Sequence, residues 1–86
     1  MEQENHKYIM FGGYIPIVFP NFLTHDKVAK AMGPIVRCGE GVTSAGFFKI
    51  ITEPKLHVVV FGRSLSLKLG TQKTDAHWIE KILFGK

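Results

Sequence analysis

The 86-residue sequence has few of the features that identify a membrane protein or a secreted protein. Its single cysteine, Cys38, excludes an internal disulfide and fits a reducing cytosol. No apolar run approaches the ~18 residues that a membrane-spanning helix needs. The first seven residues are mostly polar and lack the apolar core of a secretory signal. These absences predict a soluble, cytoplasmic protein without a membrane segment.

Sequence motifs that are typical of catalytic sites or metal sites are also lacking. The four histidines are dispersed and form no metal-ligand motif, and no serine lies in a nucleophile elbow. Cys38 and His57 form a thiol–imidazole pair only if the fold brings them together, and no family signature surrounds Cys38. We therefore expect no enzymatic activity, no cofactor and no metal, with a Cys/His-dependent enzyme as the remote alternative.

Clusters of positive charge are absent, although the chain is basic. The formal net charge is +4 and the pI is about 9.4, which favours an anionic partner. The eleven lysines and arginines are scattered, with no two adjacent. Nucleic-acid binders usually concentrate these residues on one face. The sequence leaves open whether the fold gathers Arg37, Lys49, Arg63 and Lys68, so nucleic-acid binding is the alternative function.

What the sequence does contain is a strong β signal between residues 43 and 69. It is rich in β-branched and aromatic residues, which fit a pleated, half-buried surface. Pro54 interrupts the run and predicts a turn at 53–55, so residues 44–52 and 56–61 should form a hairpin. Gly62 then permits either a tight turn, which we favour, or a bulge within one long strand.

Both faces of this hairpin carry large apolar groups. Alternation places Phe47 and Ile51 on one face, and Phe48 and Ile50 on the other. A hydrophobic fraction of 45% is difficult to bury in one small core. We therefore expect helices to cover one face and more chain or a partner to cover the other, with a homodimer as the expected assembly.

The remaining elements frame this sheet. Two strands, 7–11 and 14–19, flank a Gly12-Gly13 turn, and Pro16 predicts that the second is an edge strand. The end of the chain predicts a helix after Thr74 with an apolar stripe.

A short helix is predicted between these parts. It should cover residues 25–32, with Thr24 as its N-cap and Gly33-Pro34 as its stop signal. A short strand at 35–38 should follow, and it forms a βαβ crossover with 14–19 if the two are parallel.

The predicted fold class is α+β. We expect an antiparallel sheet of about five strands, in the order ββαβββ(β)α, with two short helices packed on one face. Residues 1–6 should be disordered, and residues 7–86 should form one small domain.

The predicted binding site lies on the strand at 64–69. Its strict alternation places leucines on one face and polar residues on the other. As an edge strand it would expose free N–H and C=O groups, which invite strand addition by a partner or by a second copy. The candidate interaction residues are Arg63, Ser64, Ser66, Lys68, Arg37 and Lys49.

Two short segments carry a resemblance to other proteins. Residues 44–48, Ser-Ala-Gly-Phe-Phe, and residues 61–67, Phe-Gly-Arg-Ser-Leu-Ser-Leu, resemble a pattern in small uncharacterised phage and prophage proteins. The resemblance covers about the last half of the chain and supplies no catalytic or binding residues. It implies a small accessory or host-directed role. Together these inferences predict a non-enzymatic interaction protein that docks on a protein partner through a sheet face or edge.

Overall fold

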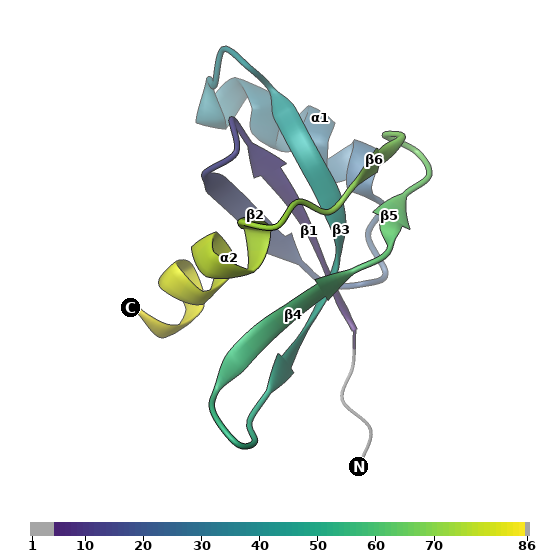
Figure 1. Ribbon diagram of the computed structural model, residues 1–86. Helices are drawn as coiled ribbons and strands as arrows, with labels where there is room; N and C mark the ends of the chain where they lie inside the picture. Colours follow the sequence, from purple (N-terminus) through teal and green to yellow (C-terminus); the bar gives the residue numbers. More distant parts are fainter. Residues whose placement is uncertain (1–4, 86) are drawn as a thin grey trace.

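The computed structural model describes residues 5–85 and has an α+β fold, as the sequence predicts (Figure 1). Predictions for residues 1–4 and for Lys86 lie outside the described residues, and His6 already belongs to the first strand. The elements in chain order are β1 (His6–Phe11), β2 (Ile15–Phe19), α1 (His25–Val36), β3 (Val42–Ile51), β4 (His57–Phe61), β5 (Arg63–Ser64), β6 (Leu69–Gly70) and α2 (Asp75–Phe84).

The main sheet has four strands in the order β2-β1-β3-β4, and each neighbouring pair is antiparallel. The predicted hairpin is confirmed, because β3 pairs with β4 from Phe47↔Phe61 to Ile51↔His57. Pro16 lies on edge strand β2, as expected for a residue without an N–H group. The sheet therefore has four strands instead of about five, and β5 and β6 form a separate two-stranded ladder.

The two helices cover opposite faces of the sheet, so the prediction that both pack on one face is wrong. In Figure 1, α2 lies in front of the sheet and α1 behind it. Tyr8 and Met10 pack with Ile79 of α2, whereas Ile9 and Phe11 pack with Val28 and other residues of α1. The reason is that β1 is apolar on both faces and successive side chains point to opposite sides of a strand. Each face therefore requires its own cover.

Helix α1 is longer than predicted, because Pro34 lies inside its last turn. A proline removes one helical hydrogen bond and crowds the preceding residue, but Gly33 has no Cβ to clash. The left-handed cap falls at Arg37 (φ 54°), whose N–H donates to the Gly33 carbonyl over 2.9 Å. The predicted strand at 35–38 is therefore wrong. The crossover does form, but it joins β2 to β3, which are parallel and lie on either side of β1.

The predicted strand at 64–69 is also wrong, since residues 65–68 form a turn. The backbone leaves the sheet at Gly62 (φ 74°), and the Ser64 hydroxyl accepts a hydrogen bond from the Leu67 N–H over 3.2 Å. Local side-chain bonds of this kind compete with strand formation. The chain then crosses β3 at Gly46, where a Cβ would lie 2.9 Å from the Phe61 carbonyl oxygen. Only glycine permits that close passage.

None of the helices within residues 5–85 is both long enough and apolar enough to cross a membrane.

Candidate interaction surfaces

Helix α2 is fixed to the sheet by a buried carboxylate. Asp75 is fully buried and accepts hydrogen bonds from the Tyr8 hydroxyl (2.5 Å), the Ser44 hydroxyl (3.0 Å) and the Gln72 N–H (2.9 Å). Burial, together with the hydrogen bond and the charge of Asp75, raises the pKa of Tyr8 well above its usual range. Because all three side chains are sealed from solvent, a substrate has no access to them. The cluster positions α2 and thereby one wall of a groove.

The free edge of β4 is partly closed. The Val58 N–H donates to the Glu80 carboxylate of α2 over 2.8 Å, so this group points away from β3 and already has a partner. Charged groups at an edge strand oppose pairing with another chain. Strand addition at β4 is therefore blocked at its first outward N–H. The predicted edge at 64–69 does not exist, and the second edge strand, β2, contains Pro16, which has no N–H to donate, so strand addition is disfavoured at both edges of the sheet.

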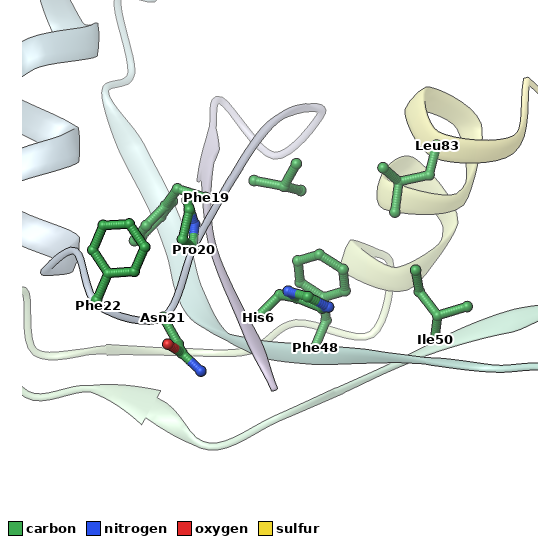
Figure 2. Close-up of a pocket in the computed structure, with 9 residues that line it drawn as sticks. His6, Phe19, Pro20, Asn21, Phe22, Phe48, Ile50 and Leu83 are labelled. Carbon is green, nitrogen blue, oxygen red and sulfur yellow. The ribbon is translucent and has the colours of Figure 1, made fainter. Parts of the chain in front are cut away.

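An apolar groove lies on the α2 face of the sheet. Figure 2 shows Phe48 and His6 between Leu83 of α2 and Ile50 on one side and the Pro20–Phe22 segment on the other. The groove has a volume of about 610 Å³. The Phe22 side chain is 79% exposed at its rim, and Leu83 is 39% exposed. The complete lining is His6, Val18, Phe19, Pro20, Asn21, Phe22, Phe48, Ile50 and Leu83.

The side chains that line the groove are almost all apolar. Its described lining includes no lysine, arginine, aspartate or glutamate, and its two polar members are His6 and Asn21. The Asn21 amide donates to the Asn5 carbonyl oxygen over 2.9 Å, and the His6 ring lies 5.3 Å from the Phe48 ring, centroid to centroid. An occupant of this groove would therefore contact mainly carbon surface, and its binding would come from apolar burial.

The six predicted interaction residues do not form one cluster. Arg63 and Lys49 both lie near the Phe47–Phe61 ring pair, on the face of the sheet opposite the groove. Arg37 caps the far end of α1, and Lys68 adopts a left-handed conformation in the 65–68 turn. Ser66 is exposed, but Ser64 is buried, with 1% exposure. The prediction that Ser64 faces solvent is wrong, because its hydroxyl is used inside the turn.

Sequence reasoning identified Phe48 and Ile50 as one apolar face of the hairpin, but it missed the walls of the groove. The signal that was available is the segment Phe22-Leu23, two apolar residues directly after a Pro-Asn turn, where polar residues are usual. The contribution of Leu83 depends on how α2 packs, which no local pattern reveals. An acid in the first turn of a helix, such as Asp75, indicates by itself only a favourable interaction with the helix dipole, although Asp75 is the group that fixes α2.

The Cys38–His57 pair is not assembled. Cys38 lies beside Gly12 at one end of the sheet, whereas His57 pairs with Ile51 at the other end of β3. The ten residues of β3 extend over about 30 Å. Across residues 5–85, no group of three His, Cys, Asp or Glu side chains is arranged to hold a metal ion.

Comparisons with protein-family models, with curated proteins and with solved structures each found no match. The resemblance to phage and prophage proteins therefore stays a prediction.

Proposed function

We propose that this chain is a non-enzymatic interaction protein that docks through the apolar groove on the α2 face. The observation that carries the proposal is the groove itself: a hollow of about 610 Å³ with an uncharged described lining and an exposed phenylalanine at its rim. Exposed apolar patches rimmed by polar residues mark interaction sites. The proposal retains the predicted docking through a sheet face, and Glu80 argues against docking through the β4 edge.

The occupant we propose is a second copy of the chain, related by a two-fold axis. In such an isologous interface the same patch on both subunits must be self-complementary. The chain carries both parts, since the Phe22 ring stands beside a hollow lined by carbon. Reciprocal insertion of each Phe22 into the partner's groove would cover both exposed rings. Because the groove lining is uncharged, charge repulsion between two basic subunits is weakest there.

The available surface is large enough for this assembly. The chain exposes 5699 Å² in total. A stable interface takes about 800 Å² from each partner, roughly one seventh of that surface. Ile82, which is 52% exposed on α2, lines a second hollow with Tyr14, Pro16 and Trp78 and adds further exposed apolar surface. The dimer would also cover large apolar side chains that the single chain leaves exposed, Phe22 and Leu83 among them.

The experiment is sedimentation velocity over a concentration series, with Phe22→Ser as the test variant. Leu65→Ser is the matched control, because Leu65 is as exposed (80%) as Phe22 but lies on the other side of the sheet. We expect the parent chain and Leu65→Ser to dimerise, and Phe22→Ser to dissociate with a Kd raised about 30-fold or more. A parent chain that remains monomeric at ~100 μM, a concentration far above a typical dimer Kd, would contradict the proposal.

The cellular setting belongs to the same proposal. The single reduced cysteine favours a cytoplasmic protein, and the resemblance to phage and prophage proteins favours an accessory, host-directed role. A protein from the host is then the further partner to test, by affinity capture with the parent chain and with Phe22→Ser.

A further inference from the structure

The face of the sheet opposite the groove carries a row of one cation and two aromatic rings. Register places Lys7 of β1 beside Phe47 of β3, and Phe47 beside Phe61 of β4. The next row holds Lys49 and Val59. All of these side chains share one face, because paired residues in a sheet project to the same side.

The geometry within this row is that of an aromatic platform with cations above it. The Phe47 and Phe61 rings are stacked, with centroids 5.9 Å apart and planes 22° apart. The Lys7 ammonium nitrogen lies 5.7 Å from the Phe47 centroid, and the Lys49 nitrogen lies 5.4 Å from the Phe61 centroid. Arg63 follows Phe61 by two residues and is exposed.

Helix α1 covers only the start of this region, through its first residue, His25, whose ring packs edge-on against Phe47 (centroids 5.5 Å apart, planes at 84°) and whose Nε2 lies 2.9 Å from the Gly46 carbonyl oxygen. The buried core beneath α1 is built on Ile9, Phe11, Phe19 and Ala45, and Phe47 lies half-buried at its margin. Figure 1 shows the β3–β4 hairpin extending well beyond α1. Phe47 and Phe61 are half-buried, and Val59 is 38% exposed. A hollow of about 310 Å³ opens beside Phe47, with Lys7, Arg63 and Leu65 among its lining residues.

The charge of this face is mainly positive. Lys7, Lys49 and Arg63 supply three cations around the ring pair. One carboxylate, Asp26, lies near the rim at the start of α1, where the hydroxyl of Thr24 and, to a smaller extent, that of Ser66 lower its pKa. Asp26 therefore stays ionised at neutral pH and offsets one of the three charges.

We infer that this face binds a single-stranded nucleic acid, with bases stacked on Phe47 and Phe61 and phosphates held by Lys7, Lys49 and Arg63. Binding of this kind combines a cationic track for the backbone with aromatic rings that accept any base. In a duplex the base faces are already stacked, so a platform of rings selects single strands. The cation–π contacts are only partly buried and each is weak, so a phosphate can draw each ammonium group away from its ring and leave that side of the ring open.

The Lys7 ammonium group reaches from the Phe47 ring to the segment that precedes α1. In the unbound chain it donates to the Leu23 carbonyl oxygen over 2.8 Å while it lies above Phe47. It thus spans the gap between the platform and the start of α1, beside the hollow that contains Arg63. A phosphate in that hollow would contact both cations. This surface is separate from the groove, so the inference goes beyond the proposed function and does not depend on it.

The test is fluorescence anisotropy with a labelled oligothymidylate of about 12 nucleotides, a length that spans a site of this size. Unlabelled single strand, duplex of the same length and poly-glutamate serve as competitors. We expect the single strand to compete well, and both the duplex and poly-glutamate to compete poorly. A plot of log K against log salt concentration should have a slope of about −2, since three neutralised phosphates on a single strand contribute ~0.7 each.

Two variants separate stacking from charge. Phe61→Leu keeps an apolar side chain but removes the ring, and we expect it to weaken binding about tenfold with an unchanged salt slope. Arg63→Gln should weaken binding and reduce the slope by ~0.7. Arg37→Gln is the charge-matched control, because Arg37 lies at the far end of α1, about 18 Å from its start. It should leave both quantities nearly unchanged.

Several outcomes would overturn the inference. Equal competition by poly-glutamate would assign the face to an acidic protein, and equal competition by duplex would exclude base stacking. Equal losses in Arg63→Gln and Arg37→Gln would show attraction by net charge alone. Thermal unfolding of each variant, followed by circular dichroism, shows whether the variants are folded. If Phe61→Leu does not fold, Lys49→Gln, whose side chain lies on the surface of the same ring, replaces it as the test.

Discussion

Asp75 is the residue on which the position of α2 depends. Its carboxylate accepts three hydrogen bonds in a site without solvent exposure, two of them from side chains of different strands. A buried charge is stable only when its surroundings donate to it, and removing its partners is expensive. The groove depends on this cluster indirectly, because Leu83 is placed by α2.

The first prediction concerns the Asp75 cluster. Asp75→Asn places an amide N–H group where a carboxylate oxygen accepted a hydrogen bond, so one buried donor loses its acceptor. We expect the free energy of unfolding to fall by about 2–4 kcal/mol, and by about 1–2 kcal/mol for Tyr8→Phe. Urea denaturation measures both. Asp26→Asn is the control, since Asp26 is exposed, and an equal loss there would contradict the assignment.

The second prediction is a pH dependence that arises from Tyr8. Burial and Asp75 raise the pKa of Tyr8 in the folded chain above its value near 10 in the unfolded chain. Between these two values the folded state holds a proton that the unfolded state has lost. Stability is therefore complete below about pH 10 and falls above it, by about 1.4 kcal/mol per pH unit from this group.

Comparison with the Tyr8→Phe variant separates the contribution of Tyr8 to the pH dependence of stability from every other contribution. Urea denaturation at several pH values above neutrality should give a shallower decline for Tyr8→Phe than for the parent chain. Identical slopes would show that Tyr8 does not titrate differently in the two states.

At the level of elements, the contact between α2 and β4 decides which edges of the sheet stay open. Val58 lies on edge strand β4, and the Glu80 carboxylate accepts its outward N–H group. An acid on a helix thus closes part of a strand edge that would otherwise recruit another chain. Together with Pro16 on the other edge strand, β2, this arrangement is the reason to place the binding surfaces on the faces of the sheet.

The third prediction tests this contact. Glu80→Ala leaves the Val58 N–H without its acceptor, so the Val58 amide should exchange with solvent faster, by about tenfold. Hydrogen exchange followed by NMR measures it. Glu53→Ala, in the exposed β3–β4 turn, is the control and should leave the Val58 rate unchanged. An unaltered rate in Glu80→Ala would show that the carboxylate does not protect the edge.

At the level of the whole molecule, the two candidate surfaces lie back to back on one sheet. Consecutive residues serve opposite surfaces: His6 lines the groove and Lys7 the aromatic platform, and Phe48 and Phe47 divide in the same way. Alternation along β1 and β3 therefore separates an uncharged surface from a cationic one. A dimer formed through the groove would leave the platform of each subunit facing outward.

The fourth prediction follows from this separation. Phe22→Ser should change self-association and leave nucleic-acid affinity unchanged, and Phe61→Leu should do the reverse. In the double variant the two effects should add, because sites without shared partners couple weakly. Sedimentation and anisotropy on the same four proteins make the comparison. A marked loss of oligonucleotide affinity in Phe22→Ser would show that the two surfaces are coupled, for example through a dimer that binds one strand across both subunits.

Much of the fold could be predicted from local sequence, and the misses have specific causes. Gly33-Pro34 resembles a helix stop, but α1 continues because packing against Ile9 and Phe11 favours the added turn. Alternation at 64–69 resembles a strand, but the Ser64 hydroxyl bonds within a turn instead. In both places a tertiary or side-chain contact outweighed the local pattern.

The candidate sites were less accessible to sequence reasoning than the fold. Lys49 and Arg63 were identified as interaction residues, and the fold does bring both to the Phe47–Phe61 pair. Lys7 was not identified, because its place beside Phe47 depends on the pairing of β1 with β3, more than thirty residues apart. Phe48 and Ile50 were recognised as an apolar face, but the groove was missed for the same reason, since its walls come from the end of β2 and from the last helix.

The sequence by itself determined the α+β class, the β3–β4 hairpin, the edge position of Pro16 and the excess of apolar side chains. These follow from periodicity, from the fixed φ of proline and from composition, which act over a few residues. Only the tertiary structure decided that the helices take opposite faces, that Asp75 holds α2, and that an apolar groove and a cationic platform occupy the two sides. Those features depend on strand order and on contacts between distant segments, and local patterns carry no information about either.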